Sequence, residues 1–144
     1  CCEAELCTNY DNVFDLLNKN NYDKISTKEA VCSSAVKTAK DINATLIICI
    51  TEDGSSARFV AKYRPSIPIL ALSMNSQVIR NMNLSRGLRG MKIATYVGTE
   101  NLINDAIAHS VEKGFAKKGD NVVCLFSQHE NQPDCANLLK ITTI

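Results

Sequence analysis

The feature that most constrains the fold is a short polar turn between an apolar segment and a helical pattern. Residues 45–50 form a continuous apolar run, and residues 57–63 place apolar side chains at helical spacing. Between them lies Thr-Glu-Asp-Gly-Ser-Ser, which we call the 51–56 turn. A strand that enters a helix through such a turn gathers backbone N–H groups, hydroxyls and the positive end of a helix dipole around one small volume. The sequence therefore predicts an α/β unit whose turn suits an anion.

The same alternation of strand and helix continues along the chain. Further helical patterns lie at residues 27–41, 73–83 and 101–113, and further strands are expected at residues 67–72, 91–97, 121–126 and 138–144. Strands that alternate with helices predict right-handed crossovers and a mostly parallel sheet. We therefore expect a single three-layer α/β domain, with a mostly parallel five-stranded sheet and helices on both faces.

The C-terminal strand is expected to differ from the others. About a dozen residues without a helical pattern join it to the preceding strand, which does not suit a helical crossover. Residues 138–144 are therefore expected to form an antiparallel strand at an edge of the sheet.

A capping box is predicted at the start of the helix at residues 27–41. The sequence Ser26-Thr27-Lys28-Glu29 allows the Ser26 hydroxyl to accept from the Glu29 amide. In such a box the Glu29 carboxylate reaches back to Ser26.

The charge balance excludes several classes of partner. Sixteen Lys and Arg residues and fifteen Asp and Glu residues give a formal net charge of +1. No basic excess is present to hold nucleic acid or a membrane surface. No apolar stretch approaches the roughly twenty residues of a membrane span, and no signal peptide opens the chain. We expect a soluble protein without nucleic-acid or membrane partners.

The seven cysteines favour neither a metal site nor a disulfide framework. No Cys-x-x-Cys pair is present, and the two histidines do not complete a zinc pattern. Cys49 and Cys124 lie among apolar residues, as reduced thiols used as small hydrophobic side chains do. The prediction is a cytoplasmic protein with no metal site.

Candidate binding residues gather where predicted strands end, because the carboxyl ends of parallel strands form the ligand crevice of such sheets. The 51–56 turn lies at one such end, and residues 73–75 and 127–129 lie at two others. A simpler interpretation stays open, in which Gly54 makes a turn and Ser55 or Ser56 caps a helix. No Gly-Lys-Ser/Thr sequence follows the turn, so a nucleotide-phosphate loop is not indicated. The candidates for binding a phosphate are Thr51, Asp53, Gly54, Ser55, Ser56 and Ser127.

Catalytic residues are not indicated. No paired carboxylates, nucleophile elbow or metal motif is present. Arg80, Arg86 and Arg89 form a candidate anion clamp, with solvated surface arginines as the alternative. The residues alone predict an α/β domain with a candidate anion site and no active site of its own.

Four stretches of the chain resemble pyruvate kinase. The resemblance covers essentially all of residues 1–144 and maps only to the C-terminal, regulatory domain of that enzyme. Residues 1–24 resemble the helix and linker that lead out of the catalytic barrel, and the missing initiator Met fits a segment of a longer protein. The four stretches are Ser-Thr-Lys-Glu-Ala-Val-Cys-Ser-Ser-Ala-Val at 26–36, Leu-Ile-Ile-Cys-Ile-Thr-Glu-Asp-Gly-Ser-Ser-Ala at 46–57, Val-Ala-Lys-Tyr-Arg-Pro at 60–65 and Gly-Phe-Ala-Lys-Lys-Gly-Asp at 114–120.

The resemblance implies that the chemistry lies elsewhere. In pyruvate kinase the barrel holds Mg²⁺, K⁺, phosphoenolpyruvate and ADP, so this domain is expected to carry no cofactor and no catalytic residue. The parent enzyme makes pyruvate and ATP in glycolysis. The family's C-terminal domain packs on its copy in a homotetramer, and in many members it binds a phosphorylated sugar on the turn matching residues 51–56. Residues 27–41 and 138–144 are the expected subunit contacts.

Three departures from the family pattern predict a degenerate effector pocket. Asp53 stands where many bisphosphate-activated members have serine, and Leu102 stands where an arginine often reaches the second phosphate. Residues 128–134 replace a glycine-rich stretch and add Glu130 and Asp134. Each departure removes positive charge, adds negative charge or stiffens the loop. We expect no response to fructose bisphosphates, while a phosphate monoester, inorganic phosphate or sulfate still occupies the serines of the turn.

Two other functions compete with this interpretation. One is a stand-alone binding module for a phosphorylated metabolite, which a natural start codon would have supported. The other is a small enzyme that uses the 51–56 turn as an anion hole, which the missing general base disfavours.

Overall fold

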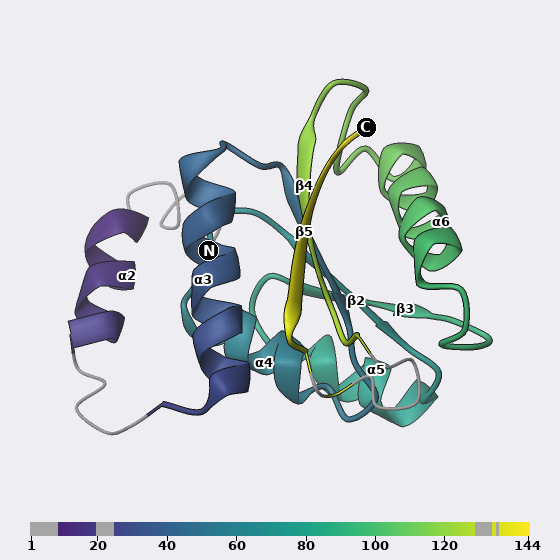
Figure 1. Cartoon of the computed structure of the whole chain (residues 1–144), viewed down its shortest axis with the longest axis horizontal. Coiled ribbons are helices and arrows are strands. Elements are labelled where there is room, and N and C mark those ends of the chain that lie inside the picture. Colours follow the sequence, from purple (N-terminus) through teal and green to yellow (C-terminus); the bar gives the residue numbers. More distant parts are fainter. Residues whose placement is uncertain (1–8, 20–24, 129–133, 135) are drawn as a thin grey trace.

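The computed structural model describes residues 9–19, 25–128, 134 and 136–144. Figure 1 shows one sheet with helices on both of its faces, and α2 lying outside α3 at the margin of the molecule. In chain order the elements are α2 (Tyr10–Lys19), α3 (Thr27–Asp41), β1 (Leu46–Ile50), α4 (Ser55–Lys62), β2 (Ile69–Ser73), α5 (Ser76–Met82), β3 (Leu88–Lys92), α6 (Thr99–Glu112), β4 (Asn121–Phe126) and β5 (Leu138–Thr143).

The strands form a single five-stranded sheet in the order β3-β2-β1-β4-β5. β1 pairs in parallel with β2 and β4, and β2 pairs in parallel with β3. β5 runs antiparallel to β4, from Asn121 opposite Thr143 to Phe126 opposite Leu138. The predicted fold class is therefore confirmed, including the antiparallel C-terminal strand at an edge. β3 forms the other edge.

Each face of the sheet has its own apolar cluster. Ile47 and Cys49 of β1 belong to the cluster under α3 and α4, whereas Leu46, Ile48 and Ile50 belong to the cluster under α6. Because both faces are covered, all five residues of β1 are buried. This explains why the strand is a continuous apolar run rather than an alternating one.

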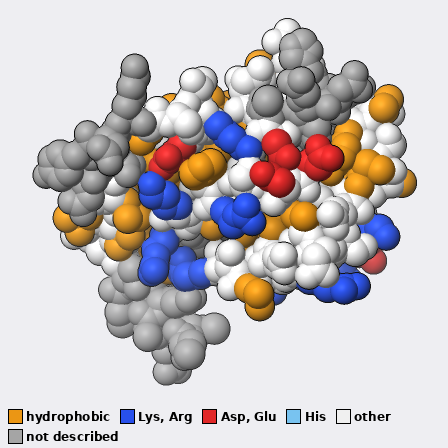
Figure 2. All heavy atoms as spheres, turned by 90° about the horizontal axis from the view of Figure 1, so that it is seen from below, with side chains coloured by type: hydrophobic (Ala, Val, Ile, Leu, Met, Phe, Trp, Pro, Cys, Tyr) orange, Lys and Arg blue, Asp and Glu red, His pale blue; other side chains and the backbone are white. Residues whose placement is uncertain are grey.

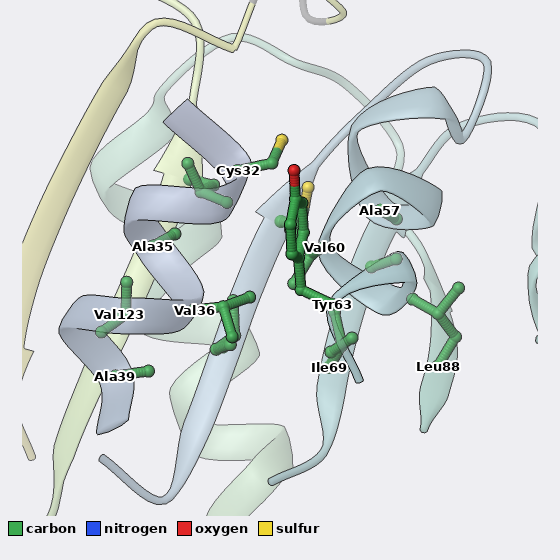
Figure 3. Packing of buried hydrophobic residues seen from close by; sticks show 14 of the residues in the cluster. Cys32, Ala35, Val36, Ala39, Ala57, Val60, Tyr63, Ile69, Leu88 and Val123 are labelled. Atoms are coloured by element: carbon green, nitrogen blue, oxygen red, sulfur yellow. The ribbon is translucent and has the colours of Figure 1, made fainter. Parts of the chain in front are cut away.

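Small side chains let α3 lie close to the sheet. Cys32 and Ala35 are fully buried, and Ala39 is almost so. Figure 3 shows these residues on the side of α3 that faces the strands, with Tyr63 between α3 and α4. Tyr63 is also fully buried, so the end of α4 packs on α3 as well as on the sheet.

The residue range predicted for one strand, the one at the exposed edge of the sheet, was wrong. The strand expected at residues 91–97 is β3, Leu88–Lys92. Leu88 is buried and pairs with Ile69, which fixes the register of β3. Its other residues are half-buried or exposed, so the segment carries little periodic signal.

Three helix starts also differ from prediction, those of α4, α5 and α6, the last of which begins at Thr99 rather than at residue 101. α5 begins at Ser76, not at residue 73, since the Asn75 side chain accepts from the Gln77 amide at 2.9 Å and caps the helix. α4 begins at Ser55, before the first apolar residue of the pattern.

The predicted capping box is half correct. The Ser26 hydroxyl accepts from the Glu29 amide at 3.2 Å, as predicted. The Glu29 carboxylate instead accepts from the Lys62 ammonium at 2.6 Å and from the Tyr63 hydroxyl at 3.2 Å. It therefore ties the first turn of α3 to the end of α4.

The cysteines that the structure describes behave as core side chains. Cys32, Cys49 and Cys124 are buried free thiols. Burial raises the pKa of Cys32 to about 11 and that of Cys124 to about 12, so neither thiol is a ready nucleophile. Outside the described residues lie Cys1, Cys2, Cys7 and Cys135, together with much of the predicted entry segment at residues 1–24.

Candidate functional site

The 51–56 turn lies at the carboxyl edge of the sheet, between the end of β1 and the first residues of α4. Ser73 ends β2 and Ser127 follows β4, the two strands that flank β1. Figure 2 views this edge from below and shows acidic and basic side chains next to one another on it. The strand ends that the sequence grouped therefore do meet along one edge.

Thr51 and Gly54 set the shape of the turn. Thr51 is fully buried, and its hydroxyl accepts from the Gly54 amide at 3.0 Å. Gly54 has a φ of 79°, which glycine adopts without strain. A Cβ at this position would lie 3.1 Å from Val78 and 3.2 Å from Met82. The turn therefore requires glycine for both its backbone conformation and its packing.

The donors of the turn converge on the carboxylate of Asp134, which lies 81 to 83 residues further along the chain. One carboxylate oxygen accepts from the Thr51 hydroxyl at 2.7 Å, from the Glu52 amide at 2.7 Å and from the Asp53 amide at 3.2 Å. The other oxygen accepts from the Asp53 amide at 3.0 Å. The sequence placed Asp134 among groups that would repel a phosphate, whereas the structure places it inside the turn.

Asp53 and Ser55 make the local bonds at the start of α4. The Asp53 carboxylate accepts from the Ser55 amide at 2.6 Å, a bond typical of Asp in turns. Burial alone would raise the pKa of Asp53, but hydrogen bonds from Ser55, with contributions from Asp134 and Lys28, lower it below the usual 3.8. The Ser55 hydroxyl accepts from the Lys28 ammonium, which brings a positive charge beside the turn.

The other two candidate serines are buried. Ser56 is fully buried and its hydroxyl has no hydrogen-bond partner, while its carbonyl accepts from the Cys32 thiol at 3.6 Å. Ser127 is 6% exposed. A phosphate in solution therefore does not reach the Ser56 hydroxyl unless the turn rearranges.

Tyr96 braces the turn from the segment after β3. Its hydroxyl donates to the Thr51 carbonyl at 3.3 Å and accepts from the Met74 amide at 3.2 Å. Sequence reasoning missed both Tyr96 and Lys28. Lys28 was considered only as part of the capping-box motif. Tyr96 lies in an irregular segment after β3, and its only signal in the sequence is that an aromatic residue follows a strand.

The remaining residues that the sequence weighed for the anion site lie away from the turn or outside the described residues. Leu102 of α6 is 8% exposed and belongs to the apolar cluster on the opposite face, so it contributes no charge. Arg86 donates to the Tyr10 hydroxyl at 2.5 Å and lies over the Tyr10 ring at 5.2 Å, which ties it to α2. Of the segment 128–134, the structure describes Gln128 and Asp134; Glu130 lies outside the described residues.

Neither a metal-binding cluster nor a membrane-spanning helix is present among the described residues. Residues 9–19, 25–128, 134 and 136–144 contain no group of three or more His, Cys, Asp or Glu side chains placed to hold a metal ion. In the same part of the chain, no helix has both the length and the apolar character needed to cross a bilayer. The expected absence of a metal site stays a prediction.

A mostly parallel sheet with helices on both faces, and a turn after its central strand whose donors bond to a carboxylate, define the class as α/β. Residues 29–142 match the family model described as the pyruvate kinase alpha/beta domain. The chain therefore belongs to the pyruvate kinase family, as its C-terminal α/β domain.

Known relatives agree with this assignment. A pyruvate kinase of Eimeria tenella is 39% identical over 144 residues, covering 100% of the chain and 27% of the relative. A pyruvate kinase of Dictyostelium discoideum is 37% identical over 147 residues, covering 100% and 29%. A crystal structure of a Cryptosporidium parvum pyruvate kinase matches with a TM-score of 0.92 at 31% identity, covering 99% of this chain and 28% of that one. The chain thus spans less than a third of the length of these relatives.

Proposed function

We propose that the chain is the regulatory and assembly domain of a cytoplasmic pyruvate kinase, which transfers phosphate from phosphoenolpyruvate to ADP. In this proposal the chain carries the effector-pocket region and a subunit interface but no catalytic site. Any Mg²⁺ and K⁺ belong to the barrel of the longer enzyme, to which residues 1–24 lead. The observation that carries the proposal is the match of residues 29–142 to the α/β domain of a family whose members are more than three times as long.

The geometry of the turn supports an effector region that does not respond to fructose bisphosphates. Its donors already bond to Asp134, and the side chains of Glu52 and Asp53 are exposed beside them. Two like unit charges 4 Å apart repel by about 1 kcal/mol in water and by about 4 kcal/mol near a protein surface. Leu102 offers no compensating charge. A bisphosphate would therefore meet repulsion at the position where the family binds one.

The edge strand supports an assembly role. β5 pairs with β4 on one side only among the described strands, and its Leu138 and Ile141 side chains are 39% and 48% exposed. An edge strand that carries exposed apolar side chains is typical of a pairing surface. We assign β5, together with α3, to contacts with a second copy of the chain in a homotetramer.

Calorimetric titration tests the effector part of the proposal. The chain is titrated with fructose 1,6-bisphosphate, fructose 2,6-bisphosphate, glucose 6-phosphate and inorganic phosphate. We expect no heat from the bisphosphates, and micromolar binding of either one would contradict the proposal. Tight binding of glucose 6-phosphate by a monomeric chain would favour the alternative of a stand-alone module for a phosphorylated metabolite.

Sedimentation tests the assembly part. We expect the chain to dimerise as its concentration rises and the Ile141→Lys variant to stay monomeric at the same concentrations. Leu84→Lys is the matched control, because Leu84 is 87% exposed but lies between α5 and β3. Equal behaviour of the two variants would remove β5 from the proposed interface.

A further inference from the structure

The Asp134 carboxylate lies where the donors of the 51–56 turn converge. Its two oxygens accept from one hydroxyl and two backbone amides, those of Thr51, Glu52 and Asp53, at 2.7 to 3.2 Å. Bonds from neutral donors to an ionised acceptor are stronger than neutral ones. α4, which begins at Ser55, also points the positive end of its dipole at this volume. The carboxylate therefore makes the kind of contacts that a bound oxyanion would make.

The shape of the turn is also held by contacts that do not involve this carboxylate. The Gly54 amide bonds to the Thr51 hydroxyl, and Tyr96 holds the Thr51 carbonyl. The positive φ of Gly54 and the hydrogen bond from the Ser55 amide to the Asp53 carboxylate are also local. If Asp134 leaves, the two amides and the hydroxyl therefore remain aimed at the same volume and need another acceptor.

The local charge favours exchange of one anion for another over addition of a second. The described charged groups in contact with or next to the donors are Glu52, Asp53 and Asp134, against Lys28 on Ser55. A phosphate added to this set would face three carboxylates. A phosphate that replaces Asp134 faces two and gains the released donors.

We propose that Asp134 is an intramolecular ligand of the 51–56 turn, an autoinhibitory contact that excludes phosphate and phosphate monoesters until the carboxylate is displaced. This inference rests on the proposed function of the turn as an effector region. It adds that the region is closed by a residue of the chain itself, rather than lacking the donors for an anion.

The contact has a measurable effect on affinity. When only a fraction of molecules has a free site, the apparent dissociation constant equals the intrinsic constant divided by that fraction. A tethered group has an effective concentration in the millimolar range or above, and it competes with phosphate for the same donors. If about one molecule in ten has the turn free, removal of the carboxylate tightens phosphate binding about tenfold.

The test is an NMR titration of the chain with inorganic phosphate, read at the amides of Glu52 and Asp53. Asp134→Ala removes the carboxylate, and Asp134→Asn keeps the size of the side chain if the alanine variant does not fold. Asp105→Asn is the control. Asp105 is exposed on α6, and its substitution changes the net charge of the chain by the same amount as Asp134→Asn. We expect the two amides to shift at about tenfold lower phosphate concentration in the Asp134 variants than in the wild type or the control.

Lys28→Met placed on the Asp134→Asn background extends the test. Lys28 is the cation bonded to Ser55, so its loss is expected to weaken phosphate binding again, while the shifts stay at the same amides. Folded Asp134 variants that bind phosphate no more tightly than Asp105→Asn would overturn the inference and leave the contact a structural tie. Failure of the proposed function is distinguishable, since micromolar binding of a bisphosphate to the wild-type chain contradicts that function whatever the Asp134 variants do.

Discussion

The buried Glu29 carboxylate links α3 to α4, and the structure allows an estimate of the free energy of unfolding that this link contributes. Its side chain is 11% exposed, and it accepts from the Lys62 ammonium at 2.6 Å and from the fully buried Tyr63 hydroxyl at 3.2 Å. Both bonds go to the same oxygen, Oε1, so Glu29→Gln keeps a neutral amide oxygen there as acceptor and removes the negative charge that strengthens both bonds. A hydrogen bond to a charged group contributes about 1.5–3 kcal/mol. Because the Lys62 side chain is 41% exposed and water reaches it, we expect a loss of about 1.5–2 kcal/mol.

Two further substitutions divide this contribution. Tyr63→Phe removes one buried hydroxyl and leaves the ion pair, so a loss of about 1 kcal/mol is expected. Lys62→Met removes only the half-exposed partner, for a loss of about 0.5 kcal/mol. The double variant Glu29→Gln with Tyr63→Phe is expected to lose less than the sum of the two single losses, because both changes act on the same hydrogen bond.

Urea unfolding followed by circular dichroism measures each free energy of unfolding. Glu100→Gln is the matched control: Glu100 also lies in the first turn of a helix and also pairs with a lysine, Lys140 at 2.6 Å, but its side chain is 70% exposed. We expect Glu100→Gln to change stability by less than about 0.5 kcal/mol. If Glu29→Gln costs no more than Glu100→Gln, burial does not strengthen the tie and the argument is refuted.

Three further predictions follow from the turn and the core. Gly54→Ala is expected to lower the free energy of unfolding by about 1–2 kcal/mol because of the left-handed φ, and by more because its Cβ would contact Val78 and Met82. Gly114 also has a positive φ, 75°, but nothing lies near its Cβ. Gly114→Ala therefore measures the backbone contribution alone in urea unfolding. Cys32 and Cys124 are expected to resist iodoacetamide at pH 8 until urea unfolds the chain, since burial raises their pKa to about 11 and about 12, and mass spectrometry would show any labelling of the native protein. The pKa of Asp53 is lowered, so its ionised form stabilises the fold above pH 3.8, and that contribution is lost as pH falls through the lowered pKa. The difference in unfolding free energy between wild type and Asp53→Asn should therefore shrink in acid. A difference that does not change with pH would refute this prediction.

The fold was predictable wherever both faces of a segment are covered. β1 is apolar along its length, and β4 from Val122 onward, because helices lie on both sides; the lack of a helical crossover before β5 indicated its antiparallel direction. β3 was misplaced because it is an edge strand with one buried residue, Leu88, and the rest of its pairing is carried by backbone bonds that leave no side-chain pattern. Glu29 was assigned to the wrong partner for a related reason, since Lys62 lies 33 residues away and local motifs do not show such contacts.

The candidate site also depends on a contact between residues far apart in the sequence, and this contact changes the chemical interpretation of the site. The local sequence predicted the turn, its glycine and its donors, because a strand, a turn and a helix within a dozen or so residues determine them. It did not predict that the donors hold a carboxylate from 81 to 83 residues away. The same Asp134 charge that was expected to disfavour an anion by repulsion occupies the position proposed for the anion. Negative charge near a set of donors therefore has two opposite meanings, a repelling neighbour or an internal ligand, and the distance from each oxygen to each donor distinguishes them. At 2.7 Å from two donors, Asp134 is a ligand.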